Sequence, residues 1–421
     1  CIQWGFDLPL DRRAGGLSVG QRQYAAVVNV ILRGCRVLIF DEVTAVISRT
    51  EAERLFALFA MLKQRGFSLI IISHKLDEVL SFADRITVLR AGKTVAALEA
   101  KNADVKTLNS LMFEETPRSG ARRRPVCEIA PRSKPARSAW SGQNVVLSVK
   151  KLTVEAQDKP FVRNIDMEVR ANSITGIAGV RDSGLETLEL ALAGLLPVKS
   201  GGITLNNTPL FSETRGAAPA VFRSAGMAYL NADRTNVCLA MDLSIWDNLV
   251  VHAYRRQPKR FLLLDKPFLD SWAQKIMARA GCSRSMREAA SSFSGGQLQK
   301  LLLERELAEL DALSKVSPPP ALFDVAANGA AERGCLLILS ESGWGLDARA
   351  RKALAEKLRF VARRHAVLLF STDIDELLEV SDEILVLNNG AFSARILVED
   401  RVFLQEYKTR VARAMTNKME L

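Results

Sequence analysis

The chain has 421 residues, of which 48% are hydrophobic and 25% are charged, and its net charge is +11. This is the composition of an ordinary globular protein that is long enough for two domains. No apolar run approaches the ~20 residues of a membrane-spanning helix, and no signal peptide is evident. The six cysteines include no C-x-x-C pair, which favours a reduced cytosolic protein over a disulfide or zinc framework.

Two apolar strands in the N-terminal region each end in polar residues. The first, Val37–Phe40, follows a Gly/Ser-containing turn at 17–21, and the second, Leu69–Ile72, is expected to be buried. Between them, apolar residues recur at helical spacing until Gly66 stops the helix. The polar residues that follow the two strands are Asp41, Glu42, Ser73 and His74.

Residues 117–143 have the composition of a linker, because arginines there are mixed with prolines and serines. Part of the positive charge is concentrated in Arg122, Arg123 and Arg124. A solvated tether between domains is the simplest interpretation, and attraction to anionic lipids or to nucleic acid is the alternative. The prolines that exclude one long helix in this segment are Pro117, Pro125, Pro131 and Pro135.

The same motifs recur, in altered form, in the C-terminal half. A second Gly/Ser-containing turn at 293–297 is followed by the apolar strands 336–339 and 367–370, with a helical pattern between them. The residues that follow these strands are Ser340, Glu341, Ser371 and Thr372.

The spacing of the motifs indicates two copies of one unit. Asp41 and His74 are 33 positions apart, and Ser340 and Thr372 are 32 positions apart. The serine of the turn and the residue at the end of the first strand are 23 positions apart in the first copy, from Ser18 to Asp41. They are 46 positions apart in the second copy, from Ser294 to Ser340. We assign the excess to an insertion near 309–335, where proline and glycine clusters indicate loop.

Helices that alternate with short apolar strands predict an α/β fold, with a mostly parallel sheet covered by helices. Nucleotides in such folds bind at the carboxyl ends of the strands. Two carboxylates at a strand end, after a small-residue turn, are suited to hold a Mg-nucleotide and a water. The polar residues expected at strand ends are Asp41, Glu42, His74, Glu341 and Thr372.

Over nearly the whole chain, these motifs resemble those of the ATP-binding cassette family. The two turns resemble its signature motif, the carboxylate strand ends its Walker B motif, and His74 its switch histidine. The resemblance implies two P-loop NTPase cassettes: residues 1–116 as the C-terminal part of a first cassette, and 144–421 as a second, degenerate one. Since only 16 residues precede Leu17, the first copy would lack its phosphate loop and glutamine loop.

The second copy keeps a phosphate-loop position that departs from the family pattern G-x-x-x-x-G-K-[ST]. In that pattern, the lysine reaches the β/γ oxygens and the hydroxyl holds Mg²⁺. Gly179 and Gly184 remain, but the lysine position is Leu185, the hydroxyl position is Glu186, and Asp182 lies inside the loop. The loop is therefore either a weak nucleotide pocket or a strand–loop–helix that is kept for folding.

Three further departures affect the same cassette. Ala232 occupies the coordinating position of the glutamine loop, Ser340 replaces the Walker B aspartate, and Thr372 replaces the switch histidine. We therefore expect that the second cassette does not hydrolyse ATP from its own phosphate loop.

The resemblance implies that the hydrolytic site is shared between the two copies. Asp41 would orient Mg²⁺, Glu42 would polarise the attacking water, and His74 would sense the γ-phosphate. Cassettes of this family pair head to tail, so each signature faces the opposite phosphate loop. The second signature, which would face the absent first loop, comprises Ser294, Gly295, Gly296 and Gln297. The first signature, which would face the altered loop, includes Ser18, Gly20 and Gln21.

Two fused cassettes, the run 44–48 and the pattern at 345–347 resemble the ATPase subunit of simple-sugar and nucleoside importers. This implies ATP and Mg²⁺ as cofactors, two membrane permease subunits, and a substrate-binding protein that acts through the permeases. A separate N-terminal cassette fragment is a further candidate partner, and nucleic acid is not expected as one. The protein would lie peripherally on the cytoplasmic face of the cell membrane, and the isolated chain is expected to be inactive.

Two other classes of protein stay open. Asp182 and the insertion favour a decayed, non-hydrolytic cassette protein. A soluble twin-cassette translation factor that acts on ribosomes would also carry a basic linker, although the linkers of those factors are long helices that the prolines here exclude.

Overall fold

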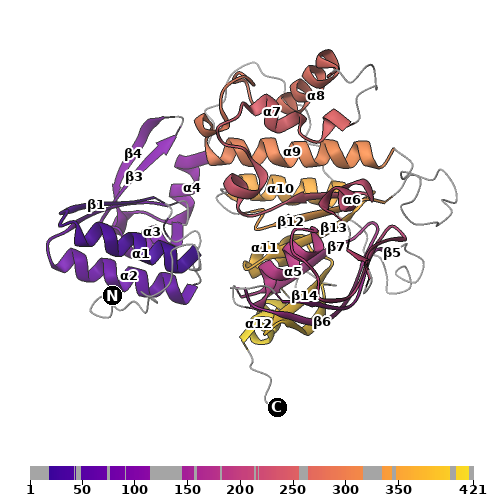
Figure 1. Cartoon of the computed structure of the whole chain (residues 1–421). Helices are drawn as coiled ribbons and strands as arrows, with labels where there is room; N and C mark the ends of the chain where they lie inside the picture. The colour runs from indigo at the N-terminus through magenta and orange to yellow at the C-terminus, as the bar shows by residue number, and fades with distance from the viewer. Residues whose placement is uncertain are drawn as a thin grey trace. The chain divides into compact units, whose positions relative to one another are not determined.

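The computed structural model describes residues 19–41, 43, 49–73, 76–90, 92–113, 145–155, 159–180, 183–212, 215–216, 218–255, 264–315, 334–343, 348–398 and 404–416. The chain divides into two compact units, residues 1–133 and 134–421, and each is described by itself (Figure 1). In these ranges, no helix is long and apolar enough to cross a membrane. The linker 117–143 and the runs 44–48 and 345–347 lie outside the described residues.

Unit 1 contains a parallel pair of strands covered by two helices, followed by a third helix, a β-hairpin and a last helix. Its elements are α1 (Val19–Leu32), β1 (Val37–Asp41), α2 (Arg49–Gln64), β2 (Ser68–Ile72), α3 (Leu76–Phe82), β3 (Arg85–Arg90), β4 (Lys93–Glu99), η3 (Ala100–Asn102) and α4 (Val105–Phe113). Strand β1 pairs with β2 in parallel, and β3 pairs with β4 in antiparallel orientation.

The core of unit 1 forms between one face of β1 and the helices α1 and α2. Leu38 and Phe40 point into this core, and the ring of Phe40 stacks on that of Phe59 with centroids 4.4 Å apart. The helical spacing seen in the sequence is confirmed, because its apolar residues are all buried in α2: Leu55, Leu58, Phe59 and Leu62.

The expectation that the second strand is buried was wrong. Ile70 and Ile72 are each 50% exposed. A β-strand has two faces with alternating side chains, and among the described residues the helices cover only one face of the β1–β2 pair.

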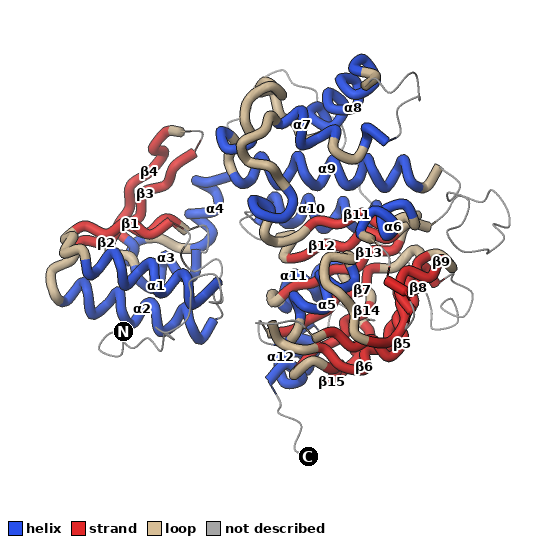
Figure 2. Tube along the Cα trace, in the orientation of Figure 1, coloured by secondary structure: helices blue, strands red, loops and turns tan. Residues whose placement is uncertain are grey.

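Unit 2 contains two sheets with helices around them, as Figure 2 shows. Its strands are β5 (Val145–Val154), β6 (Val162–Arg170), β7 (Ile174–Gly179), β8 (Ser200–Leu205), β9 (Thr208–Ser212), β10 (Arg215–Gly216), β11 (Met227–Leu230), β12 (Leu336–Ser340), β13 (Ala366–Ser371), β14 (Glu383–Asn388) and β15 (Ala391–Leu397). Its α-helices are α5 (Leu185–Leu192), α6 (Pro219–Ser224), α7 (Ile245–Val250), α8 (Lys266–Arg279), α9 (Gly295–Leu313), α10 (Ala348–Val361), α11 (Ile374–Val380) and α12 (Leu404–Thr416).

The larger sheet has the order β11-β12-β13-β7-β14-β15, and only β15 runs antiparallel to its neighbour. This confirms the predicted mostly parallel sheet. Every residue of β12, β13 and β14 is buried, because one face packs on the second sheet and α5 and the other on α9–α12. The second sheet, β10-β9-β8-β5-β6, is antiparallel and was not predicted.

The region assigned to an insertion begins as helix. Helix α9 has 19 residues and continues to Leu313, whereas its counterpart α1 has 14. Part of the extra length of the second copy is therefore a longer helix, and residues 316–333 lie outside the described range.

Candidate functional site

The second signature motif forms the start of α9. Ser294 is the N-cap: its Oγ accepts a hydrogen bond from the Gln297 N–H at 3.4 Å, and Gln297 Oε1 accepts one from the Ser294 N–H at 3.1 Å. This reciprocal capping box fixes the direction of the helix and leaves its other first-turn N–H groups without helical partners. Such a helix start favours an anion.

The two signature glycines leave open space in front of this helix start. Ser294, Gly295 and Gly296 are exposed, and a Cβ added at either glycine would meet no protein atom within 4 Å. Packing in this unit therefore does not require glycine at these positions. Free space beside unpaired N–H groups is what close approach of a ligand needs.

Only part of the first copy's site lies in the described residues. Helix α1 starts at Val19 and contains Gly20 and Gln21, as the motif predicts, and Asp41 is the exposed last residue of β1. Three further residues of the predicted site lie outside the described range: Ser18, Glu42 and His74.

The phosphate-loop position of unit 2 connects β7 to α5, and its glycines are required by packing. A Cβ on Gly179 would lie 2.5 Å from Ser183 Oγ, and Gly184 has a φ of +93°. The Ser183 N–H and Oγ both donate to the Val180 carbonyl, at 3.0 and 2.6 Å. These bonds join Ser183 to Val180, while Arg181 and Asp182 between them lie outside the described residues.

The residues that replace the lysine and the hydroxyl have other partners. Leu185 is buried and packs in the core between the two sheets. Glu186 Oε1 forms an ion pair with Lys159 Nζ at 2.6 Å. The next hydroxyl, that of Thr187, donates to the Pro160 carbonyl at 2.8 Å, so it is committed to the fold as well.

A buried polar network lies behind this loop. Glu189 of α5 accepts hydrogen bonds from the Tyr229 hydroxyl and from Asn231 Nδ2, each at 2.7 Å, and the Ser340 hydroxyl is a further partner. Burial raises the pKa of Glu189 to about 7 and raises the pKa of Tyr229 as well. The Walker B position of this copy therefore contacts a protein carboxylate.

Two more carboxylates meet at the ends of β12 and β13. The Ser371 hydroxyl lies 2.6 Å from Glu376 Oε2 and 3.2 Å from Glu341 Oε2. Glu341 Oε1 also accepts the Thr372 N–H at 2.8 Å. Burial raises the pKa of both carboxyls, that of Glu376 to about 7, and like charge adds to this, from Asp373 at Glu341 and from Glu341 at Glu376.

Glu341 and Thr372 do lie at neighbouring strand ends, as the sequence predicts, but Glu341 is not free to act as a base. Its carboxylate caps the segment after β13, and its own φ is +46°. Arg234 Nη2 donates to the Glu341 carbonyl at 3.2 Å, so this strand end is held from both sides.

These residues do not fit Mg-ATP in unit 2. The loop has no cation at its lysine position, and three carboxylates lie at or behind these strand ends: Glu189 is buried, and Glu341 and Glu376 are half-buried. Bringing a polyanion beside them would cost both repulsion and the loss of their present hydrogen bonds. The geometry supports a loop kept for folding rather than a weak nucleotide pocket.

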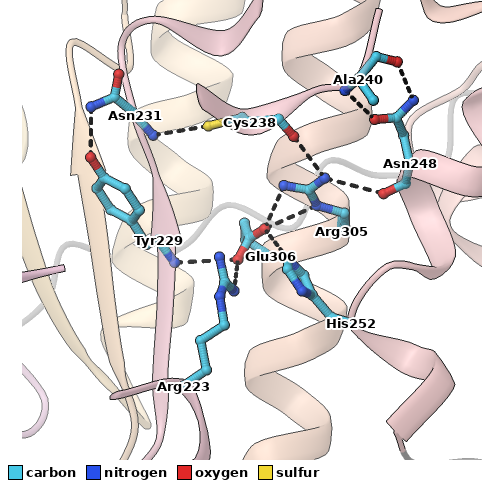
Figure 3. Close-up of polar contacts among 9 residues, drawn as sticks. All are labelled: Arg223, Tyr229, Asn231, Cys238, Ala240, Asn248, His252, Arg305 and Glu306. Carbon is cyan, nitrogen blue, oxygen red and sulfur yellow. Dashed lines mark hydrogen bonds and ion pairs between the residues drawn. The ribbon is translucent and has the colours of Figure 1, made fainter. Parts of the chain in front are cut away.

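A second network ties the signature helix to the strand β11 (Figure 3). Glu306 of α9 is fully buried, and its carboxylate accepts from the Tyr229 N–H at 3.2 Å and from Arg223 Nη1 at 3.1 Å. Burial alone would raise its pKa, but Arg223 and Arg305 outweigh burial and hold the pKa of Glu306 well below its usual range. His252 Nε2 lies 3.5 Å from the same carboxylate.

Arg305 extends this network to the segment that follows the glutamine-loop position. Its Nη1 donates to the carbonyls of Cys238 and Asn248, each at 3.1 Å, and its Nε donates to Glu306 (Figure 3). Asn248 in turn exchanges two hydrogen bonds with the backbone of Ala240. The middle of α9 is therefore connected to residues 238–248.

Comparisons with known proteins agree with this geometry. The family described as ABC transporter matches residues 162–313. The nucleoside import ATP-binding protein NupA of Lactococcus lactis is 30% identical over 394 residues, which are 92% of this chain and 69% of NupA. The chain belongs to the ABC transporter family.

Two further ABC relatives are of the same kind. The glucose import ATP-binding protein TsgD13 of Haloferax volcanii is 30% identical, over 94% of this chain and 66% of that protein. The ribose import ATP-binding protein RbsA of Bacillus licheniformis is 28% identical, over 94% of this chain and 71% of that protein. The chain thus spans about two thirds of the length of its sugar- and nucleoside-importing relatives.

Sequence reasoning missed the polar residues that now fill or support the ABC site. Those of the second unit are Lys159, Glu189, Tyr229, Asn231, Arg305, Glu306 and Glu376. One signal was available: Glu189 and Glu306 each interrupt a leucine-rich helix face, where a charged residue is buried only with partners.

Proposed function

We propose that this chain is an ATP-binding subunit of an ABC importer for simple sugars or nucleosides. In this proposal, unit 2 supplies a signature motif to a nucleotide that another phosphate loop holds. The observation that carries it is a contrast inside unit 2: Ser294–Gln297 form an open, capped helix start, while the loop at Gly179–Glu186 has a buried leucine at the lysine position and a lysine-paired glutamate at the hydroxyl position.

The proposed hydrolytic site combines Asp41, Glu42 and His74 with the Ser294–Gln297 signature. Asp41 would orient Mg²⁺, Glu42 would polarise the attacking water, and His74 would respond to the γ-phosphate. Asp41 is exposed at its strand end and therefore open to a ligand, unlike the buried Ser340 at the corresponding position. The proposal includes two permease subunits as partners, with the chain peripheral on the cytoplasmic face of the membrane.

The test is ATP turnover by the complex that the chain forms in its own cells, isolated in detergent through a tag on the chain. We expect membrane permeases in the complex, and turnover on the order of 1 s⁻¹ or more, within the common range of enzymes. The Glu42→Gln variant should abolish turnover, because the attacking water loses its base.

The second candidate is a decayed cassette protein that folds but does not hydrolyse ATP. The phosphate-loop position without its lysine and hydroxyl, and the raised pKa of Glu341 and Glu376 in unit 2, favour it. A complex with permeases but no turnover above that of the Glu42→Gln variant would establish it. A complex with ribosomal particles in place of permeases would establish the translation-factor class.

A further inference from the structure

The turn that follows β12 is held by side chains from two helices. Glu376 of α11 accepts hydrogen bonds at Oε1 from the Ser342 hydroxyl at 2.7 Å and from the Gly343 N–H at 2.6 Å. Gln299 lies near the start of α9 and is buried, and its side-chain amide donates to the Ser342 carbonyl. The signature helix is therefore connected to the end of β12 through this turn.

A buried hydroxyl lies between two carboxyls beside the turn. Ser371 Oγ is 2.6 Å from Glu376 Oε2 and 3.2 Å from Glu341 Oε2. It also accepts a hydrogen bond from the Asp373 N–H at 3.0 Å. A serine hydroxyl has one hydrogen, so it can donate to only one of the two carboxyls. If both carboxyls were ionised, one of them would face the hydroxyl oxygen with no hydrogen between them.

One proton on Glu376 Oε2 satisfies these contacts together. The carboxylic acid then donates to Ser371 Oγ, and the hydrogen of Ser371 is left to donate to Glu341. Oε1 of Glu376 remains an acceptor for the turn, and 2.6 Å is an ordinary length for an O–H···O hydrogen bond. Burial raises the pKa of Glu376 to about 7, and the charge of Glu341 also raises it, so both favour the same assignment.

The charges around the two carboxyls favour a bound proton as well. Carboxylates outnumber cations there, and an excess of negative charge favours the neutral form of a carboxyl. One of the cations, Lys408, is already paired with Asp375 at 2.6 Å. The charged groups around the pair are Arg234 after β11, Arg351 of α10, Asp373, Asp375 and Glu379 at or in α11, and Lys408 of α12.

A cavity between α10 and α11 offers Glu376 a second position. Its volume is about 60 Å³, which is room for roughly two water molecules at ~30 Å³ each. Glu376 and Arg351 both line it. A Cβ added at Gly343 would lie 3.1 Å from Glu376 Oε1 and 3.6 Å from Arg351 Cδ, so the carboxyl and the arginine flank the same point. An ionised Glu376 would turn from the Gly343 N–H toward Arg351 and water.

We propose that Glu376 and Glu341 share one proton through Ser371, and that this proton closes a pH-sensitive latch between the signature helix α9 and the end of β12. With the proton bound, Glu376 holds the turn after β12, and the turn holds α9 through Gln299. Loss of the proton to water leaves two negative charges beside one hydroxyl and releases Glu376 from the turn. The inference goes beyond the proposed function and does not depend on it, because no nucleotide takes part.

The first test is amide hydrogen exchange of the full chain near pH 6 and near pH 8, on either side of the Glu376 pKa of about 7. Peptides that cover 294–300 and 341–343 are compared with the intrinsic exchange rate at each pH. We expect their protection to fall about tenfold, because release of the proton gains about tenfold per pH unit above the pKa. Glu376→Gln should abolish the fall, since its amide makes the hydrogen bonds of the protonated acid at every pH.

Asp375→Asn is the matched control, because Asp375 lines the same cavity on the same helix but is paired with Lys408. It should keep the fall in protection. Three results would overturn the proposal: no fall in the unmodified chain, an equal fall in the Glu376→Gln variant, or a fall that Asp375→Asn abolishes.

Infrared spectroscopy detects the proton itself. Glu189→Gln first removes another carboxyl whose pKa is about 7. In that background, we expect a carbonyl band of a protonated carboxyl near pH 6 that weakens near pH 8 and disappears when Glu376→Gln is added. A band that Glu376→Gln leaves unchanged would also overturn the proposal.

A last variant separates the connection to α9 from the proton. Gln299→Leu should keep the infrared band and the pH dependence of exchange at 341–343. It should remove the pH dependence at 294–300, because α9 then has no side-chain bond to the Ser342 carbonyl. An unchanged pH dependence at 294–300 would show that the turn does not hold the signature helix.

Discussion

Unit 1 and unit 2 contain helices and strands in the same order around two strand ends, but these strand ends differ in their exposure to solvent. In unit 1, Asp41 is exposed and the apolar face beside it is uncovered among the described residues. In unit 2, the corresponding Ser340 is buried, and the carboxylates near it are bonded to their neighbours. In the described residues of unit 1, a strand-end carboxylate is open to solvent, whereas unit 2 has the strand, loop and helix of a phosphate loop without its lysine and hydroxyl.

The comparison shows that the packing of a fold and the chemistry of its site make different demands on the same positions. Closing a core needs apolar volume and satisfied hydrogen bonds; in unit 2, Leu185 supplies apolar volume and Glu189 has hydrogen-bond partners. A catalytic carboxylate needs the opposite, a position left open for a ligand. Glu341 has lost that position, because the Thr372 N–H and the Ser371 hydroxyl now occupy its oxygens.

The largest expected effect comes from blocking the signature motif of one predicted site and comparing it with the same change at the other site. In the isolated complex, Ser294→Arg should lower ATP turnover at least 100-fold, as should Glu42→Gln, since a positioned base contributes about 10²–10⁴-fold. The matched variants Ser18→Arg and Glu341→Gln should cost much less, because the loop they face does not fit Mg-ATP. Steady-state ATPase rates of the four variants decide this. Equal losses from the two serine variants would mean that both sites work.

The next effect concerns the stability of unit 2. Glu306→Ala leaves the buried Arg305 without its carboxylate, and breaking a buried ion pair in this way costs about 3–5 kcal/mol of unfolding free energy. Lys300→Ala is the control, since Lys300 is exposed on the same helix. Urea unfolding of the full chain measures both. The network does not hold α9 in place if the two variants are equally stable.

A smaller effect is a pH dependence of the stability of unit 2. Glu189 and Glu376 have folded pKa values of about 7 against an ordinary 4.5, so the folded state binds more protons between these values. The unfolding free energy is therefore highest below pH 4.5 with respect to these groups and falls as pH rises toward 7, by roughly 1.4 kcal/mol per pH unit for each.

Urea unfolding of the full chain at pH 5 and pH 7.5 tests this dependence against the variants Glu189→Gln and Glu376→Gln. Each variant should show a smaller loss between the two pH values than the unmodified chain. A loss of the same size in all three proteins would show that these carboxyls titrate normally.

The smallest effect is expected in the linker between the units. Replacing Arg122, Arg123 and Arg124 by glutamine should change the unfolding free energy by no more than ~0.5 kcal/mol per residue, as for most exposed charges. Binding of the chain to RNA duplexes, measured against salt, is the second readout. A steep salt dependence that these changes reduce would favour the translation-factor class over the importer.

The sequence predicts much of the fold, and the particular elements show why. Helix α2 and strand β13 were predicted because their apolar residues repeat with the helical period or run without interruption. Strand β2 has an equally apolar run, but it is half exposed. The residues of a strand do not show whether another element packs on its second face. The antiparallel sheet was missed because its strands pair with segments far away in the chain.

By itself, the sequence determined the two copies, their spacing, the signature helix that starts after Ser294, and the absence of lysine and hydroxyl from the Gly179–Glu186 loop. These features depend on residue identity and local spacing, which can be read from the sequence. Only the tertiary structure decided which partners the side chains at the altered positions have. It placed Leu185 in the core, Glu186 against Lys159, and Glu341 against the backbone of Thr372. The physical reason is that burial and hydrogen-bond partners depend on segments that are distant in the chain, and the identity of a residue does not specify them.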